Sequence, residues 1–224
     1  KLRKDLDWKD TITQILYRPF DVQWILYHDD MIERTRKEVM QHMLEENIGL
    51  TWTRPQSPTY EFSVLVSNRI VDQCVVGNKS AGGGISYLAP LYIYRKIPSK
   101  KKAAFTQLMM FEPEEEYAAI LSNISGEVRS MLTKYYKKPF LNPTDIDRDI
   151  KGFGSKNIFY YIYAILYSNT YRTKYADFLK IDFPRIPFTK DYKLFIKLGK
   201  LGEHLAELHL LKSKDFEKQK RKLQ

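Results

Sequence analysis

The stretch Ile158–Ser168 reads IFYYIYAILYS and contains, up to Tyr167, the longest apolar run of the chain. Apolar side chains recur in it at helical spacing, at Ile158, Ile162, Ile165 and Leu166. We therefore predict a helix over Asn157–Ser168. A membrane span needs about 18 or more consecutive apolar residues, so this run is too short for one, and we expect no membrane partner.

The sequence around this stretch continues the helical pattern. Further helices are predicted over Glu127–Tyr136, Thr170–Leu179 and Asp191–Leu211. Two prolines forbid a helix over Ile181–Pro187, which we predict to be extended. In the last helix the spacing of the leucines predicts a buried stripe made of Leu194, Leu198, Leu201, Leu205, Leu208 and Leu211.

The first half of the chain has the short β-branched and aromatic runs that are typical of strands. They lie at Ile12–Tyr17, Val22–Tyr27, Leu50–Thr53, Phe62–Val66, Ile70–Val76 and Leu91–Tyr94. Proline in Arg18–Asp21 predicts a tight corner between the first two strands. Helical spacing predicts one helix over Thr35–Glu46, and the glycines of Ser80–Gly84 predict a mobile loop.

These patterns predict an α+β fold with a β-rich N-terminal half and a helical C-terminal half. The poorly periodic junction between Lys100 and Glu116 suggests a boundary there. We place a β-rich subdomain at residues 1–110 and a helical C-terminal subdomain at residues 111–224. The chain begins Lys1-Leu2-Arg3, without an initiator Met, which predicts that it is cut from a longer polypeptide.

The composition describes a folded, basic protein. The chain has 224 residues, of which 43% are hydrophobic and 29% charged. Its 37 Lys and Arg against 27 Asp and Glu give a formal net charge of +10, which favours DNA, RNA, anionic lipid or acidic protein as partners. The single cysteine, Cys74, excludes a disulfide framework and a cysteine-based zinc site, and suits a reducing cytoplasm.

No motif for catalysis or for a metal is visible. Gly152-Phe153-Gly154 lacks the third glycine of a dinucleotide-binding loop, and Gly82–Gly84 lacks the Lys-Ser/Thr of a P-loop. Asn142–Asp145 lacks the second proline and the aromatic residue of an amino-methyltransferase loop. His204 and His209 lie five residues apart, which does not stack them on one helical face. We therefore predict no catalytic or metal-ligating residue.

Basic and amide side chains interleaved with aromatic residues are more informative. Lys and Arg neutralise phosphates, while planar Arg, Asn and Gln can hydrogen-bond to base edges. The alternative interpretation is a set of solvated charged faces. The residues we predict to contact DNA are Arg34, Arg36, Arg54, Gln56, Asn78, Lys79, Lys100, Lys101, Lys102, Arg172 and Lys174.

Several segments together resemble one protein family. They are Tyr17–Asp21 with Tyr27, Arg36 with Val39–His42, Asn47–Leu50, Pro90–Tyr94 (with Ala89 where the family has Phe), Ile158–Ser168, Thr170–Arg172, Tyr175–Lys180, Asp182–Pro187 and Leu208–Leu211. They are similar to the C-terminal specificity region, or target recognition domain, of Type ISP restriction–modification enzymes and related fused endonuclease–methyltransferases. The resemblance spans nearly the whole chain.

The resemblance implies that this chain is one domain of a larger bacterial DNA-modifying enzyme, whose functions are carried by different domains. Other domains of such a parent chain carry a nuclease, often a helicase motor, and an adenine-N6 DNA methyltransferase, whose cofactors are S-adenosylmethionine, Mg²⁺ and ATP. This fragment then holds no cofactor and is non-catalytic. It recognises a sequence in double-stranded DNA and positions the target adenine for methylation by the separate domain.

The recurring aromatic block then belongs to the scaffold, and we expect the tyrosines of Tyr160–Tyr167 to pack in the core. The loops around Arg54–Tyr60, Asn78–Ser86 and Arg95–Lys102 are expected to approach the duplex.

Two other functions remain open at this stage. One is a protein-interaction module that docks the methyltransferase to the motor or nuclease, with the Tyr-rich helices as its surface. The other is a hidden nuclease site at Asp147, Asp149 and Lys151.

Overall fold

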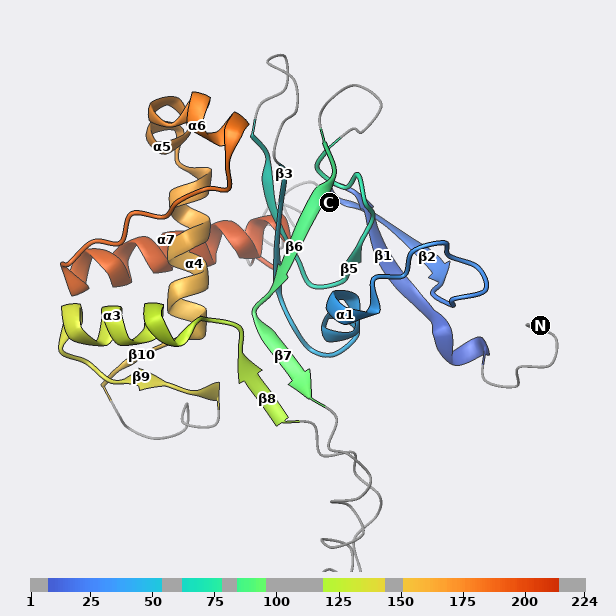
Figure 1. Cartoon of the computed structure of the whole chain (residues 1–224), viewed down its shortest axis with the longest axis horizontal. Helices are drawn as coiled ribbons and strands as arrows, with labels where there is room; N and C mark the ends of the chain where they lie inside the picture. The colour runs from blue at the N-terminus through green and yellow to red at the C-terminus, as the bar shows by residue number, and fades with distance from the viewer. Residues whose placement is uncertain (1–7, 54–61, 78–83, 96–118, 144–150, 214–224) are drawn as a thin grey trace, which may run out of the picture.

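The computed structural model describes residues 8–53, 62–77, 84–95, 119–143 and 151–213. Strands fill the N-terminal half and helices dominate the C-terminal half, as Figure 1 shows, which confirms the predicted α+β class. Two short strand pairs complete the described strands: β7 (Tyr92–Arg95) pairs antiparallel with β8 (Ala119–Ser122), and β9 (Phe140–Leu141) pairs in parallel with β10 (Phe153–Gly154) within the helical half (Figure 1).

The predicted corner at Arg18–Asp21 is confirmed as the turn of a hairpin. After a short 3₁₀ segment, η2 (Trp8–Thr11), strand β1 (Ile12–Arg18) pairs antiparallel with β2 (Asp21–Leu26). Pro19 presets φ at the first turn position, and Phe20 adopts the left-handed conformation, with φ 65°. On its other side β1 pairs in parallel with β5 (Ile70–Val71), so the sheet order is β2-β1-β5.

A second sheet of order β4-β3-β6 forms the centre of the molecule. Strand β3 (Gly49–Thr53) pairs antiparallel with β4 (Val64–Ser67) and with β6 (Ser86–Pro90). The predicted strands at Leu50–Thr53 and Phe62–Val66 correspond to β3 and β4. Sequence patterns missed β6, and they overextended β5 to Val76. Strand pairing stops at Asp72, whose carboxylate accepts a hydrogen bond from Cys74 N at 2.9 Å and starts a turn.

The helix predicted over Thr35–Glu46 is wrong in length. The structure has only α1 (Lys37–Met40), continued by the 3₁₀ segment η3 (Gln41–Met43). Arg36 precedes α1 in the left-handed conformation, with φ 47°, so no helix can run through it. At the other end the buried Asn47 amide bonds His42 O and Tyr92 O, each at 2.8 Å, and directs the chain into β3.

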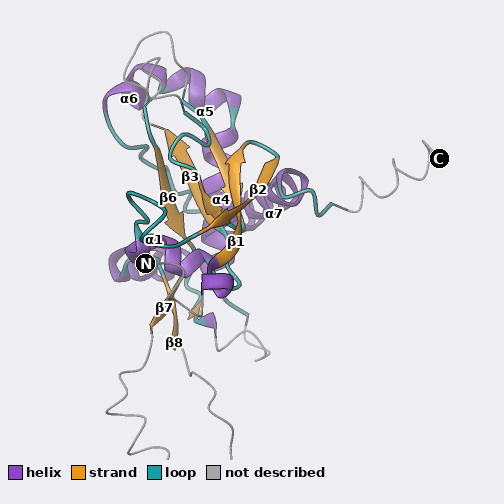
Figure 2. Ribbon diagram, turned by 90° about the vertical axis from the view of Figure 1, so that its right-hand side faces the viewer, coloured by secondary structure: helices purple, strands orange, loops and turns teal. Residues whose placement is uncertain are grey.

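The helical half consists of five helices within the described residues. They are α3 (Gly126–Tyr136), α4 (Ser155–Tyr167), α5 (Asn169–Lys174), α6 (Ala176–Ile181) and α7 (Tyr192–His209). The helix predicted over Thr170–Leu179 is in fact α5 and α6, which break at Tyr175. Figure 2 shows the α5–α6 pair at one end of the central strands and the β7–β8 hairpin at the other.

The predicted leucine stripe of α7 is only partly right: Leu198, Leu205 and Leu208 are half-buried, and the first two pack against the hydrophobic core. Leu194, Leu201 and Leu211 are exposed, whereas Phe195, Gly199, Gly202 and Ala206 are buried. Helix α7 packs across α4, and a Cβ built on Gly202 would lie 1.9 Å from Tyr160 O. At Gly202 the contact face therefore requires a residue without a side chain, because the two helix backbones approach too closely there for a leucine.

One hydrophobic core joins the two halves. Leu50, Val66 and Leu91 of the strands pack with Phe159 and Tyr163 of α4. The proposed boundary at residues 110 and 111 falls outside the described residues, so the division into two subdomains stays a prediction.

The lowered pKa values of two histidines lead us to expect that acid destabilises the folded chain. Burial lowers the pKa of His42, whose Nδ1 accepts from Tyr94 N at 3.2 Å. Burial and, secondarily, the charge of Arg172 lower the pKa of His209. The unfolded chain therefore takes up protons first, and the stabilising effect present above about pH 6.5 should be lost as the pH falls below it.

Urea unfolding at about pH 7.5 and about pH 5.5 measures this effect. A His42→Gln variant should show a smaller difference between the two free energies of unfolding. An unchanged difference in that variant would contradict a role for His42.

Candidate nucleic-acid interface

A cavity of about 520 Å³ opens between the β1–β2 hairpin, the segment before α1, and strands β5 and β6. The apolar part of its wall includes Ile15, Ile25, Ile70 and Leu88. Ile15, Ile25 and Ile70 are distant in sequence and meet because β1 joins β2 and β5 in one sheet, whereas Leu88 comes from β6 of the second sheet. The cavity is therefore a product of the strand order.

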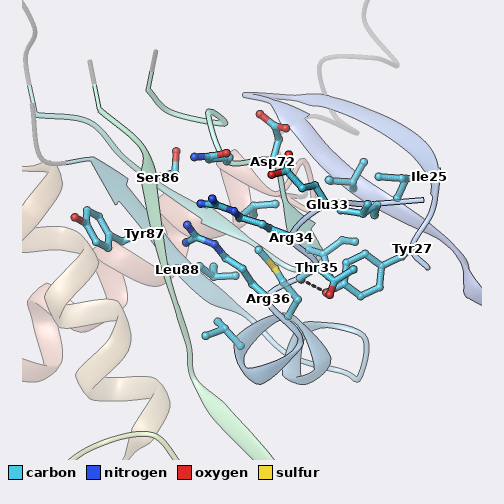
Figure 3. Close-up of a pocket in the computed structure, with 17 residues that line it drawn as sticks. Ile25, Tyr27, Glu33, Arg34, Thr35, Arg36, Asp72, Ser86, Tyr87 and Leu88 are labelled. Carbon is cyan, nitrogen blue, oxygen red and sulfur yellow. Dashed lines mark hydrogen bonds between the residues drawn. The ribbon is translucent and has the colours of Figure 1, made fainter. Parts of the chain in front are cut away.

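Two predicted DNA-contacting residues, Arg34 and Arg36, line this cavity together. Both side chains are exposed, and Figure 3 shows both guanidinium groups pointing into the cavity toward β6. In the part of the chain that the structure describes, neither guanidinium has an ion-pair or hydrogen-bond partner. Their donors are thus available to an external acceptor.

The segment that carries the arginines is tied to the end of β2. The Tyr27 hydroxyl donates to Thr35 O, and Asp29 bonds both the Thr35 hydroxyl, at 2.9 Å, and the Lys37 ammonium. Burial, followed by the charges of Asp29 and Glu38, raises the pKa of Tyr27 to about 12, so its hydroxyl stays a donor at neutral pH. The hydrogen bond from Lys37 is the main cause of a lowered pKa of Asp29.

Carboxylates also line the cavity. Asp72 is paired with Arg18 at 2.8 Å, and Glu33 is exposed beside Arg34. Guanidinium groups match the O6 and N7 acceptors of guanine, and carboxylates accept from the amino group of cytosine. The cavity thus combines donors and acceptors suited to base edges.

Seven predicted contact residues lie outside the described residues: Arg54, Gln56, Asn78, Lys79, Lys100, Lys101 and Lys102. Two of the described residues near these segments are strand partners: Thr53, at the end of β3, pairs with Ser86, at the start of β6. Residues 54–61 and 78–83 therefore adjoin, in sequence, the same end of the central sheet, where Ser86 and Tyr87 line the cavity.

The structure does not bring Arg172 and Lys174 to this cavity. Both lie on α5, where Arg172 is half-buried and donates from Nε to Leu166 O at 2.8 Å. Its guanidinium carbon lies 4.6 Å from the centre of the Tyr167 ring. Lys174 is exposed beside Tyr175. Their contact with DNA stays a prediction, separate from the cavity.

Sequence patterns pointed to the two arginines and to the loop that ends at Ser86, but missed Tyr27, Glu33, Thr35 and Asp72, which also line the cavity. No spacing signals them, because strand pairing brings them together from separate parts of the chain. The pair Arg34 and Arg36, two residues apart, was the one local signal.

The Tyr-rich helix α4 is scaffold, as predicted. Tyr161 and Tyr163 are 1% and 0% exposed. The Tyr161 hydroxyl donates to Pro187 O at 2.7 Å, and that of Tyr163 contacts His209 Nδ1. Burial raises the pKa of Tyr163 well above its usual value. These two rings therefore supply neither a base-stacking platform nor a docking surface.

A different apolar surface lies on the hairpin. Val22 and Trp24, on β2, are 40% and 71% exposed, and Ile12 on β1 is 44% exposed. The register places these residues on the face opposite Ile15 and Ile25, which line the cavity.

No group of three or more metal-ligating side chains occurs among the described residues. Likewise, none of the described helices is long and apolar enough to cross a membrane. Asp147 and Asp149 of the alternative nuclease site lie outside the described residues, and Lys151 is exposed.

A family model described as the Type ISP C-terminal specificity domain matches residues 1–224. No curated protein sequence matches the chain.

Several solved structures share the fold. A DrdV–DNA complex determined by cryo-EM matches with a TM-score of 0.63 and 24% identity, over 90% of this chain and 16% of that one. The ATP-dependent Type ISP restriction–modification enzyme LlaBIII bound to DNA matches with a TM-score of 0.61 and 22% identity, over 89% of this chain and 11% of that one. A nuclease-deletion mutant of the Type ISP enzyme LlaGI, in complex with a DNA substrate mimic, matches with a TM-score of 0.55 and 22% identity, over 89% of this chain and 14% of that one. The chain thus spans a small part of these larger proteins.

Proposed function

The chain belongs to the family of Type ISP C-terminal specificity domains, and from this premise we propose that it recognises a specific sequence in double-stranded DNA. The observation that carries the proposal is the cavity into which Arg34 and Arg36 point without partners among the described residues. Structural neighbours that are complexes with DNA support it.

In the proposed mechanism, one set of contacts holds the phosphate backbone and another set recognises the bases. Lysines and arginines neutralise phosphates and fix the orientation of the duplex, while Arg34 or Arg36 bonds a base edge in the major groove. One good bidentate contact of this kind discriminates by about 1–3 kcal/mol. The salt dependence of the affinity then measures the phosphate contacts, and the preference among DNA sequences measures the base contacts.

We place this domain within a larger restriction–modification enzyme of the bacterial cytoplasm. It is non-catalytic and binds no cofactor, whereas other domains of the parent chain use S-adenosylmethionine, Mg²⁺ and ATP. By binding its site, it positions the target adenine for flipping into the methyltransferase pocket. Its partners are thus duplex DNA and the methyltransferase and nuclease or helicase domains of the same chain.

Selection of bound sequences from a random duplex pool tests the proposal. The full-length polypeptide that contains these residues should enrich one sequence, and the same polypeptide without this domain should enrich none. Equal enrichment by both would place sequence recognition elsewhere in the parent chain.

A protein-docking module is the second candidate function, and the exposed hairpin face favours it. A Trp24→Ser variant separates the two. If this face only docks other domains, the variant should weaken their association with this domain and leave the enriched sequence unchanged.

A further inference from the structure

We infer that Tyr27 and Asp29 are positioning residues, which hold Arg34 and Arg36 in the orientation that contacts DNA. The inference rests on the proposed function and goes beyond it, because neither Tyr27 nor Asp29 needs to touch the duplex. Both lie outside α1, in the segment that leads from the end of β2 to the arginines.

The first observation is that the contacts of Asp29 fall on the two residues that flank Arg36. Asp29 uses one carboxylate oxygen for the Thr35 hydroxyl and the other for the Lys37 ammonium. Thr35 lies between the two arginines in sequence, and Lys37 directly follows the second. Thr35 and Lys37 are therefore both tied to Asp29, whereas the arginines that alternate with them have guanidinium groups without partners among the described residues.

The second observation is that the backbone of the same segment is fixed at both ends. Tyr27 is buried, and its hydroxyl donates to Thr35 O, a contact that Figure 3 marks with a dashed line. Met31 N and Ile32 N both donate to His28 O at 3.0 Å. Beyond the arginines, Val39 N and Met40 N donate to Arg36 O at 3.1 and 3.0 Å.

The third observation is the conformation of Arg36. A φ of 47° is unfavourable for a residue with a side chain and persists where surrounding contacts hold it. The tied neighbours Thr35 and Lys37 supply those contacts on either side. Held in advance, the arginines lose less conformational freedom when they bind DNA.

These contacts contribute little to the stability of the fold. The Lys37 and Asp29 side chains are 56% and 59% exposed, and ion pairs this exposed contribute little to folding. Charge alone predicts the opposite of our expectation, because removing an acidic residue near a DNA-binding surface strengthens the attraction to phosphate. A loss of affinity on removing Asp29 would therefore point to positioning.

The test measures binding by the full-length polypeptide to the duplex that it enriches. Asp29→Ala should weaken binding by about tenfold, which equals about 1.4 kcal/mol. Tyr27→Phe removes a single hydrogen bond and should weaken binding by a smaller factor. Asp177→Ala is the matched control, because Asp177 forms an exposed ion pair with Lys180 on α6, away from the cavity, and should leave affinity unchanged.

A double-mutant cycle separates positioning from general destabilisation. In a background with Arg34→Ala and Arg36→Ala, Asp29→Ala should cause no further loss, because its effect passes through the arginines. An undiminished loss in that background would overturn the inference. The inference would also be overturned if Asp29→Ala and Tyr27→Phe both bind with wild-type affinity while the arginine variant loses binding. That result would leave the proposed function intact. If the variant with Arg34→Ala and Arg36→Ala itself binds with wild-type affinity, the proposed contact between these arginines and DNA is wrong, and the positioning role is wrong with it.

Discussion

Replacing Arg34 and Arg36 together by alanine should weaken binding of the full-length polypeptide to its preferred duplex by about a hundredfold. The estimate assigns about 1.4 kcal/mol to each guanidinium, at the low end of the range for a bidentate base contact. Both groups point into the cavity and are free of partners among the described residues, so no bond to a described residue offsets their loss. Titrations at several salt concentrations measure the effect.

Substitution by lysine shows which kind of contact is lost. Lysine keeps the charge but not the planar fork of donors. If the arginines bond bases, Arg34→Lys with Arg36→Lys should relax the sequence preference and leave the salt dependence nearly unchanged. If they hold phosphates, the alanine variant should lower the slope of log affinity against log salt by about 0.9 for each contact.

The matched control is a pair of exposed lysines on α7. Lys193→Ala with Lys197→Ala removes the same charge from a helix that packs on α4, on the other side of the molecule. Its affinity for the preferred duplex should stay near that of the wild type. An equal loss in both variants would show that net charge, and not the cavity, determines binding.

The cavity also shows where prediction from sequence stops. Arg34 and Arg36 stood out because a local pattern of basic residues signals phosphate or base contact. The walls against which they lie come from β1, β2, β5 and β6, and nothing local indicates that β1 pairs in parallel with β5. Strand pairing between distant segments has no short-range signature, so the sequence pointed to the two arginines but not to the cavity that they line.

Helix α7 shows a similar limit inside the fold. Its length was predicted to within two residues at each end, because an Asp191 N-cap and a long periodic segment are local signals. Its buried face was only partly right, because leucine spacing was weighted above the glycines between the leucines. A glycine in a helix looks like a weak point in sequence, whereas here it permits close contact with α4.

That contact leads to a strong expected effect on stability. Gly202→Ala should lower the free energy of unfolding by about 3 kcal/mol, the upper end of the usual cost of overpacking. The new Cβ would lie 1.9 Å from Tyr160 O and 2.7 Å from Tyr160 C, and both of these are backbone atoms of α4 that no side-chain rotation can move. The two helices would have to separate, which loosens the core that Phe195, Ile158 and Tyr161 share.

Gly199→Ala, one turn earlier on the same helix, is the control. Its Cβ would meet Asn157 O at 3.4 Å, an ordinary van der Waals contact. Alanine also favours the helix over glycine by up to about 1 kcal/mol, so this variant should be as stable as the wild type or more so. Thermal unfolding of the chain compares the two: about 3 kcal/mol corresponds to a fall in Tm of roughly 6–12 °C for Gly202→Ala. Equal Tm values for the two variants would mean that α4 and α7 do not approach each other as closely as the structure shows.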